Sequence, residues 1–485
     1  MPYDDLQSFL KALDAAGELK RISAEVNPIL EVTEITDRVS KSKDASNKAL
    51  LFENVNGSSL PLSINTFGSY KRMQMALGCE SFDELADRIA ELTRPEVPTG
   101  IWNKIKKGID FLKIGSYVPK VRSAAGALCQ EIVHTDDANL EMLPALQCWP
   151  SDGGRYITLG QITTKHPDTH IRNLGMYRAQ IFGPKNTAMH WHMHHDGARH
   201  FRAWAAQNKP CPLAITLGGE SVLPYAATAP LPPGIDEHLF AGFLMGKALD
   251  LVPCKTVPLE VSANAEIVIE GYVDPRQTIL EGPFGDHTGF YSLASHYPIF
   301  NVTAITHRKN PIYPTTIVGR PPQEDYYFGK ATERIFLPLL KLIIPDIIDY
   351  DMPMFGVFHS CIFVKIKKEY PYHARKVMSA IWGTGQLAWI KIIVIVDEDV
   401  DVHSVDDVMF HVAANVDPKR DVMLTDGPLD ILDHAAPYEG AGGKMGIDAT
   451  RKLPGEGQVR EWPTAIKMDQ ATIDKVTKRW KDYGF

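Results

Sequence analysis

The amino-acid sequence predicts a mixed α/β protein with three domains. Its 485 residues are enough for roughly three domains of average size. The hydrophobic pattern also changes twice along the chain, from helical spacing, to closely spaced β-rich runs, to an alternation of strands and helices. We expect an N-terminal mixed α/β domain over residues 1–114, a β-rich domain over 115–320 and a C-terminal α/β domain over 321–485.

The N-terminal domain is expected to open on an amphipathic helix, because apolar residues recur at i, i+3, i+4 and i+7. Asp4 or Asp5 can cap its start and Gly17 can end it. Segments near 29–41 and 81–92 are also predicted to be helical. The apolar face of the first helix consists of Leu6, Phe9, Leu10 and Leu13.

Short β-rich runs follow through the middle third, separated by glycine, proline and polar residues. Many short strands joined by turns are typical of a barrel or a strongly bent sheet. The runs cover Tyr156–Lys165, Leu174–Phe182, Pro212–Gly218, Leu259–Val273 and Tyr297–His307.

Strand and helix patterns alternate in the last third, which indicates an α/β domain. The expected elements are a helix near 328–343, a strand over Gly356–Ile366, a helix over His373–Ile381, a strand over Ile390–Asp397 and a helix over Val405–Val416.

A final helical stretch, Gln470–Trp480, places Ile473, Val476 and Trp480 on one face. A terminal helix with such an apolar stripe packs either on its own domain or on a partner subunit. The sequence leaves both alternatives open.

The charge and cysteine patterns argue against several classes of protein. The net charge is −8 with acidic and basic residues interspersed, so we expect no nucleic-acid partner. The six cysteines form no CxxC pair, which is typical of reduced thiols in a cytoplasmic protein. The N-terminal segment is acidic and has no continuous apolar run, so it does not resemble a signal peptide.

Two carboxylates, Glu281 and Asp286, lie close together in the segment EGPFGDHTG. Gly282, Pro283 and Gly285 between them predict a tight, rigid connection that can direct both toward one cavity. Two close carboxylates push their pKa values apart, so that one can hold a proton near neutral pH while the other stays charged. The pattern indicates a general acid beside an ionised carboxylate. A turn whose carboxylates cap backbone amides is the alternative.

The segment RNLGMYR begins at Arg172 and ends at Arg178. An arginine in an apolar strand needs a carboxylate partner, either from the protein or from a substrate. On a regular strand Asn173 and Arg178 would point to opposite faces. We therefore expect a bulge at Gly175.

Alternate histidines at 190, 192 and 194 would share one face of a strand. Such an arrangement suggests a metal site, although the HExxH motif of zinc hydrolases is missing. A zinc hydrolase using His190–His195 is a distant alternative, and a polar lining of a cleft is the simpler interpretation.

The glycine-rich segment Gly440–Gly446 differs from a phosphate-binding loop. Tyr438 replaces the first required glycine, and Met445 replaces the Ser or Thr that should follow Lys444. We expect a flexible turn there.

Taken together, these segments resemble the UbiD decarboxylase family, and within it the bacterial 4-hydroxy-3-polyprenylbenzoate decarboxylases. The resemblance runs along nearly the whole chain, and the combination of NLGMYR with EGPFGDHTG is its specific part. The other matching segments are YDDLQSFLKALDAAGELKRI, ALLFENVNG, GRPP at Gly319–Pro322 and KMGIDATRKLPGE.

The resemblance implies reversible, non-oxidative decarboxylation of an aromatic carboxylic acid, with a polyprenylated hydroxybenzoate as one substrate candidate. Because no side chain can serve as the electron sink for a carbanion at an sp2 carbon, a cofactor must do so. In this family the cofactor is prenylated FMN, supplied by a flavin prenyltransferase, and a covalent substrate–flavin adduct is protonated before release. A small phenolic, heteroaromatic or polycyclic acid is an alternative substrate. A non-catalytic flavin-binding module is a more distant alternative function.

Matching positions carry the implied roles. Asp286 corresponds to the proton donor, and Glu281 and Arg178 complete an ionic network that faces the flavin. The implied metal ligands are Asn173, His194 and Glu237. The residues expected to bind or line the flavin are Met176, Tyr177, Arg178, His190, Trp191, His192, His195, Asp196 and Lys391.

Oxygen and nitrogen donors of this kind suit Mn²⁺ or Mg²⁺, with K⁺ or Na⁺ as a further cation. His190 stands where close relatives have arginine, so the phosphate contacts are expected to differ. The resemblance also implies a split β-barrel as the flavin-binding middle domain, and a homo-oligomer, dimeric or hexameric, assembled through the C-terminal domain. With a polyprenylated substrate, contact with a membrane would be peripheral.

Overall fold

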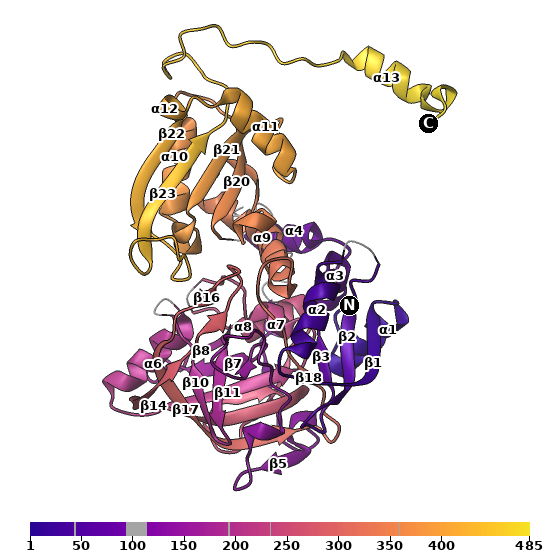
Figure 1. Ribbon diagram of the computed structural model, residues 1–485, viewed down its shortest axis with the longest axis vertical. Helices are drawn as coiled ribbons and strands as arrows, with labels where there is room; N and C mark the ends of the chain where they lie inside the picture. The colour runs from indigo at the N-terminus through magenta and orange to yellow at the C-terminus, as the bar shows by residue number, and fades with distance from the viewer. Residues whose placement is uncertain (43–44, 94–113, 193–194, 233, 358) are drawn as a thin grey trace, which may run out of the picture.

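The computed structural model describes residues 1–42, 45–93, 114–192, 195–232, 234–357 and 359–485. Figure 1 shows two lobes, with the long helix α9 (Glu324–Ile343) between them. The N-terminal and middle parts of the chain form one lobe, and the C-terminal part forms the other. This architecture confirms the predicted mixed α/β class. The predicted boundary at residue 114 adjoins residues outside the described part and stays a prediction.

Helix α1 (Leu6–Ala15) forms as its pattern predicts. The Asp5 side chain accepts a hydrogen bond from the backbone N–H of Ser8, and the Ser8 hydroxyl accepts one from the backbone N–H of Asp5. Gly17 follows the helix with φ of +68°, a conformation that favours glycine. All four predicted apolar residues of the helix are buried. The helices that follow are α2 (Glu31–Ser40), α3 (Tyr70–Leu77) and α4 (Phe82–Thr93).

A four-stranded sheet connects the N-terminal part to the middle part. Its order is β1 (Leu19–Val26), β2 (Ala49–Val55), β3 (Leu62–Ile64) and β18 (Tyr313–Pro314). Because β18 belongs to the end of the middle part of the chain, its pairing with β3 joins the two parts. One hydrophobic core runs from Phe52 and Leu62 in this sheet to Ile269 and Phe300 in the next.

The larger sheet has nine strands in the order β6-β9-β10-β17-β14-β11-β7-β8, and β5 pairs with β17. The strands are β5 (Ile132–His134), β6 (Tyr156–Ile157), β7 (Gln161–Lys165), β8 (Arg172–Met176), β9 (Ala179–Gly183), β10 (Asn186–Met189), β11 (Cys211–Gly218), β14 (Ala265–Glu281) and β17 (Ser295–His307). The flanking elements are β4 (Lys120–Val121), α6 (Asp196–Ala206), α7 (Leu223–Ala226), α8 (Glu237–Met245), β12 (Asp250–Pro253), β13 (Glu260–Ser262), β15 (Phe284–Gly285) and β16 (Tyr291–Ser292).

This sheet curls until its two ends meet. Strand β8 lies at one end and β9 next to the other, yet only Tyr177 and Arg178 separate them in the chain. Two residues span at most about 10 Å, so the ends of the sheet must come together. The expected bulge at Gly175 is wrong, because β7 and β8 pair without a register shift. The strand instead ends at Met176, so strand alternation does not fix the direction of Arg178.

Gly175 is required for a different reason. A Cβ atom there would lie 2.2 Å from the Tyr177 hydroxyl oxygen. The Tyr177 ring therefore occupies the space that a side chain at 175 would take. The small residue permits the chain to fold back directly after β8.

The C-terminal lobe contains a five-stranded sheet in the order β19-β20-β21-β23-β22. Its elements are β19 (Ile347–Asp351), β20 (Cys361–Ile366), α10 (His373–Trp382), β21 (Ile392–Asp397), α11 (Val405–Asn415), α12 (Pro418–Asp421), β22 (Val422–Pro428) and β23 (Ala441–Asp448). The alternation predicted for this part is confirmed. Strand β20 begins later than predicted, because Val357 adopts a left-handed φ of +42° that ends a short 3-10 turn.

The flexible turn expected at Gly440–Gly446 is wrong. Gly442, Gly443 and Lys444 lie within β23, which pairs with β21 on one side and β22 on the other. Pairing with β22 along Gly442–Lys444, and with β21 from Met445 onward, outweighs the weak strand preference of glycine.

The terminal helix α13 (Gln470–Lys478) has no buried residue. It lies at the end of an extended segment that projects from the C-terminal lobe (Figure 1). Ile473 and Trp480 are 43% and 51% exposed, so their predicted stripe does not pack on the helix's own domain. Among the described residues, no helix is long and apolar enough to cross a membrane.

Candidate active site

The centre of the candidate site is an ion-pair network around Arg178. Its Nε atom lies 2.9 Å from Oε1 of Glu281, and its Nη1 atom lies 2.6 Å from Oδ2 of Asp286. Nη2 also donates to the Ser292 hydroxyl at 3.0 Å. The ring of Phe284 lies 4.4 Å below the guanidinium carbon. The arginine and both carboxylates are almost completely shielded from solvent. The electrostatic attraction within each ion pair is therefore stronger than it would be at the surface.

Three segments bring these side chains together. Arg178 lies in the joint between β8 and β9, and Glu281 is the last residue of β14. Asp286 follows β15, which pairs with β16 in an antiparallel arrangement. In keeping with the predicted tight connection between them, both carboxylates contact the same partner, Arg178.

Asp152 holds this connection in place. Its carboxylate accepts hydrogen bonds from the backbone N–H groups of Gly285 at 2.7 Å, Trp149 at 2.9 Å and Cys148 at 3.0 Å. A Cβ atom at Gly285 would lie 2.1 Å from Cδ1 of Trp149, so the indole packs directly against the backbone beside Asp286. Asp152 was not among the predicted residues, because a lone aspartate in a polar turn gives no signal of this role.

The two carboxylates are both ionised in this arrangement. Burial raises the pKa of Glu281, but the hydrogen bond from His190 and the charge of Arg178 bring it below its ordinary value. Burial likewise raises the pKa of Asp286, and the hydrogen bond and charge of His287 together with Arg178 lower it further than burial raises it. The expectation that one of them holds a proton near neutral pH is therefore wrong here. The Arg178 cation lies between them and removes the repulsion on which that expectation rested.

His190 extends the network. Its Nδ1 atom lies 3.0 Å from Oε2 of Glu281, and its Nε2 atom lies 2.8 Å from Nε2 of His192. Burial lowers the pKa of His190, so the neutral ring donates to Glu281 through Nδ1–H. His190 thus bonds to a carboxylate of the network.

The predicted strand with three histidines on one face is wrong for the residues described. Strand β10 ends at Met189, and the backbone N–H of His190 bonds to the carbonyl of Arg178 as the chain leaves the sheet. His192 instead stacks on His195, with ring centroids 4.9 Å apart. His194 lies outside the described residues.

An aromatic cluster lies beside Arg178. The Tyr177 ring centroid is 4.8 Å from that of His195 and 6.4 Å from that of Trp191, which packs on Phe201 of α6 at 5.3 Å. Met176 completes the same segment at the end of β8. The buried Nε1–H of Trp191 has no hydrogen-bond partner in the part of the chain that the structure describes. A flat ring system with polar edges fits such a surface.

Asn173 and Glu237 both lie close to Tyr177. The Glu237 carboxylate accepts a hydrogen bond from the backbone N–H of Leu174 at 2.8 Å. Burial raises the pKa of Glu237 to about 7. The Nδ2 atom of Asn173 is buried and has no partner among the described residues. The Glu237 carboxylate and the Oδ1 atom of Asn173 are oxygen donors of the kind that Mn²⁺ or Mg²⁺ prefers, whereas the unpartnered Nδ2 atom is a hydrogen-bond donor and gives no support for a cation.

Two predicted cofactor residues lie in other surroundings. Lys391 comes directly before β21 in the C-terminal lobe, and its Nζ atom pairs with Asp433 at 2.7 Å. Asp196 is the first residue of α6 and pairs with Arg199 at 2.9 Å. Lys391 thus pairs within the C-terminal lobe, away from the aromatic cluster on the curled sheet.

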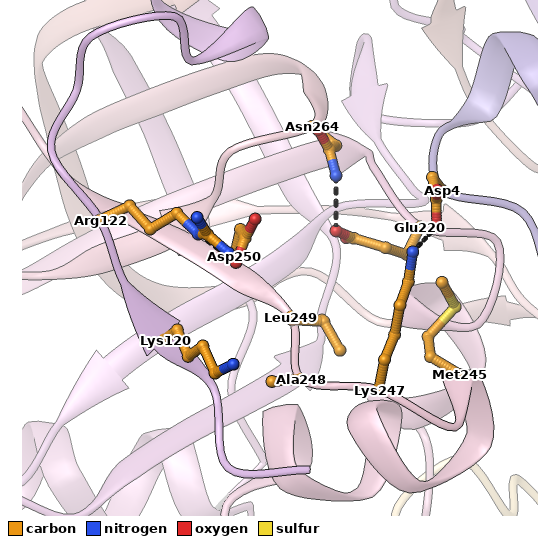
Figure 2. Close-up of a pocket in the computed structure, with 10 residues that line it drawn as sticks. All are labelled: Asp4, Lys120, Arg122, Glu220, Met245, Lys247, Ala248, Leu249, Asp250 and Asn264. Carbon is orange, nitrogen blue, oxygen red and sulfur yellow. Dashed lines mark hydrogen bonds and ion pairs between the residues drawn. The ribbon is translucent and has the colours of Figure 1, made fainter. Parts of the chain in front are cut away.

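A polar pocket of about 380 Å³ lies apart from these residues, between the N-terminus, β4 and the segment before β12 (Figure 2). Lys247 pairs with Asp4 at 2.6 Å and Arg122 with Asp250 at 2.5 Å. None of the candidate site residues lines this pocket.

Glu333, Asp351 and His403 also converge, in the C-terminal lobe. The ammonium group of Lys330 already pairs with both carboxylates, so a protein cation occupies the position that a metal would take. No sequence pattern predicts a metal at these three residues.

Comparison with known protein families identifies the class to which this chain belongs. Sequence models of the three parts of 3-octaprenyl-4-hydroxybenzoate carboxy-lyase match consecutive stretches of the chain: the N-terminal domain over residues 10–91, the Rift-related domain over 120–321 and the C-terminal domain over 326–449. The chain belongs to the UbiD family. It is accordingly a carboxy-lyase, and the zinc-hydrolase alternative built on His190–His195 is wrong.

Solved structures of UbiD-class enzymes share the fold along the whole chain. The vanillic acid decarboxylase of Sedimentibacter hydroxybenzoicus in closed form is 27% identical, with a TM-score of 0.85 and 99% of both chains covered. Its open form, at 26% identity, has a TM-score of 0.79 and covers 99% of this chain and all of that one. HmfF of Pelotomaculum thermopropionicum in complex with FMN is 26% identical, with a TM-score of 0.80 over 99% of this chain and 100% of that chain.

A relative from Aquifex aeolicus is closer in sequence, with 49% identity over 99% of both chains. The UbiD fold therefore holds over the whole length, including the region of Arg178, Glu281 and Asp286. Two further residues touch this network and had no predicted role, although His287 lies within the segment EGPFGDHTG. His287 bonds to Asp286, and His359 of the C-terminal lobe bonds to His287.

Proposed function

We propose that this UbiD-family enzyme catalyses the reversible, non-oxidative decarboxylation of an aromatic carboxylic acid with prenylated FMN. The observation that carries the proposal is the buried contact of Arg178 with two acidic side chains beside an aromatic cluster. Relatives support it, since HmfF binds FMN, an evolved dimeric form of HmfF binds prenylated FMN, and the Sedimentibacter enzyme acts on vanillic acid. When bound, the prenylated flavin supplies the electron sink that no side chain provides.

The residues of the network have separate tasks in this proposal. Arg178 would either hold the substrate carboxylate through a charge-assisted hydrogen bond or stay bridged to Glu281, as it is here. Glu281 keeps Arg178 in position from the side opposite Asp286. Asp286 gives the proton that replaces carbon dioxide on the substrate carbon, and its burial keeps competing water away.

The second group of residues is assigned to the cofactor and its metal. Asn173, Glu237 and His194 would hold Mn²⁺ or Mg²⁺, and K⁺ or Na⁺ would lie nearby. Support comes from the raised pKa of Glu237, which burial causes and a cation would reverse. Met176, Tyr177, Trp191, His192 and His195 would line the flavin. His190 would influence the flavin through its contact with Glu281. Asp196 and Lys391 would contact the cofactor at the edges of the site.

The substrate class remains an aromatic acid, either a polyprenylated hydroxybenzoate or a smaller phenolic, heteroaromatic or polycyclic acid. The partners in this proposal are a flavin prenyltransferase that supplies the cofactor and further copies of the same chain. The exposed apolar stripe of α13 supports the second partner.

The test is to co-produce the protein with a flavin prenyltransferase and to measure its flavin by mass spectrometry and absorbance and its metals by elemental analysis. The same preparation is incubated in D₂O with a panel of aromatic acids. We expect prenylated flavin, manganese or magnesium, and loss of carbon dioxide with deuterium incorporation from one group of acids. A flavin-free protein after this treatment would contradict the proposal.

A further inference from the structure

A chain of hydrogen bonds leads from Asp286 into the other lobe. The Oδ1 atom of Asp286 accepts from the backbone N–H of His287 at 2.8 Å and lies 2.9 Å from Nδ1 of the same residue. The Nε2 atom of His287 lies 2.7 Å from Nε2 of His359, in the segment just before β20. Asp286 and His287 belong to the lobe of the curled sheet, and His359 belongs to the C-terminal lobe. The two imidazoles thus meet where the lobes touch.

The surrounding charges indicate which of the two histidines in this series of hydrogen bonds is protonated. Burial lowers the pKa of His287, but its hydrogen bond to Asp286 and the charges of Asp286, Asp325 and Asp430 bring it above its ordinary value. Burial and the charge of His287 lower the pKa of His359 to about 4. His287 is therefore the cation, donating to Asp286 through Nδ1–H and to His359 through Nε2–H, and His359 is neutral.

Charged groups face this pair from each element that packs on it. Arg178 and Asp286 lie on the side of the curled sheet. Asp325 lies in the first turn of α9, and burial raises its pKa to about 7. Asp430 and Asp433 lie in the segment between β22 and β23. The carboxylates around the pair favour the proton on His287.

A protonated His287 explains how Asp286, which is ionised, can act as the proton donor. This inference rests on the proposed function. Each turnover places one proton on the substrate carbon, yet the Asp286 carboxyl is ionised while Arg178 and His287 contact it. Asp286 is 6% exposed, so bulk water does not reach it freely. Its nearest proton-bearing nitrogen that can release a proton near neutral pH is Nδ1 of His287, because the Arg178 guanidinium stays protonated.

We propose that His287 is the proton reservoir of the reaction and that His359, brought by the C-terminal lobe, positions and stabilises its charged form. The proton moves from Nδ1 of His287 to Oδ1 of Asp286 and from there to the carbon that loses carbon dioxide. One proton is consumed for each carbon dioxide released, and His287 is left neutral. It takes up a proton from solvent when the lobes separate and His359 withdraws.

The contact between the two lobes agrees with the closed form of the Sedimentibacter enzyme. The chain has the higher TM-score to the closed form of the Sedimentibacter enzyme, 0.85 against 0.79 for its open form. The rings of Phe290 and His434 also meet between the lobes, with centroids 4.0 Å apart. His434 is therefore a matched control: a histidine at the same lobe contact that is outside the hydrogen-bond chain.

The test measures kcat, KM and their pH dependence for four variants of the flavin-loaded enzyme. His287→Asn keeps an N–H near the position of Nδ1 but cannot carry a proton. We expect its kcat to fall at least tenfold with KM little changed, and we expect the fall of activity at alkaline pH to disappear. His287→Ala should regain activity on addition of imidazole. His359→Asn should move the alkaline fall to lower pH, and His434→Asn should leave the profile of the wild type unchanged.

The outcomes separate this inference from the proposed function. Wild-type kcat and an unchanged alkaline limb in His287→Asn would overturn the reservoir while the decarboxylase assignment stands. Loss of activity in His287→Asn and His287→Ala with no imidazole rescue and an unchanged pH profile would reduce His287 to a structural residue. Turnover retained in Asp286→Asn would instead overturn the assigned proton donor and the proposed mechanism.

Discussion

Arg178 and Asp286 form a 2.6 Å ion pair between residues 108 positions apart in the chain. The Asp286→Asn variant keeps the size of this side chain and one oxygen that can accept from Arg178. It cannot deliver a proton, so we expect turnover to fall by roughly 10²–10⁴-fold, the usual contribution of a general acid. Flavin and metal content should stay at the wild-type level, which the absorbance and elemental analysis of the purified variant would check. Normal turnover would remove Asp286 from its role.

Glu237 is the most direct test of the metal assignment. The Glu237→Gln variant keeps the shape of the side chain and removes the charge that attracts a cation. We expect its metal content to fall to a small fraction of that of the wild type and its flavin to bind more weakly. The control is Glu260→Gln, a nearby carboxylate that pairs with Lys165 and Arg172. Equal metal content in both variants would refute the assignment.

Gly175 tests the aromatic cluster. In Gly175→Ala the new Cβ atom would require the Tyr177 ring to move, at a cost of about 1–3 kcal/mol for an overpacked interior position. We expect a lower flavin content and a lower melting temperature. Gly443→Ala serves as the control, since a Cβ atom at this strand glycine meets nothing within 4 Å. Identical flavin content in the two variants would show that Tyr177 does not shape the site.

His403 gives the C-terminal lobe a predicted pH dependence. Hydrogen bonds to Asp349 and Asp351 raise its pKa to about 9. The folded protein then binds this proton more tightly than the unfolded chain, so the ion pairs stabilise fully below about pH 6.5 and are lost as the pH rises through about 9. Because the side chain is 42% exposed, the effect should stay below about 1 kcal/mol.

The measurement compares melting temperatures of the wild type and His403→Asn across this range. The difference should be largest at the acidic end and vanish above about pH 9.5. His411→Asn is the control, because its closest carboxylate oxygen is 3.9 Å away. A difference that does not change with pH would contradict the prediction.

Helix α13 should determine the assembly state. A chain that ends before residue 465 keeps every buried residue of the C-terminal lobe, so we expect it to fold and to remain as stable as the full chain. Light scattering should show fewer subunits per particle than in the intact protein. Trp480→Ala should weaken assembly in the same direction, whereas Lys478→Ala should not. An unchanged particle mass after truncation would place the subunit contacts elsewhere.

The sequence predicted those features that depend on local pattern. The helix over Leu6–Ala15 followed from its apolar spacing, and the fold class followed from the change of pattern along the chain. The convergence of Glu281 and Asp286 followed from a short connection rich in glycine and proline. These features are set within a few residues, so periodicity and turn chemistry are enough to identify them.

Features that depend on distant parts of the chain could not be predicted in this way. The direction of Arg178 depends on where β8 ends, which is set by the closing of the sheet. The ionisation of both carboxylates depends on Arg178 lying between them. The glycine-rich segment at 440–446 becomes a strand only because β21 and β22 flank it. The His287–His359 contact depends on the arrangement of two lobes, which no local pattern encodes.

The joint of Tyr177 and Arg178 also restricts how this enzyme can change over evolution. Most surface loops tolerate inserted residues, because a longer loop costs little free energy. Here a single inserted residue would lengthen the link that closes the sheet and displace the arginine on which both carboxylates depend. Lineages that acquire new substrates can therefore be expected to vary the walls and edges of the site while keeping the length of this link constant.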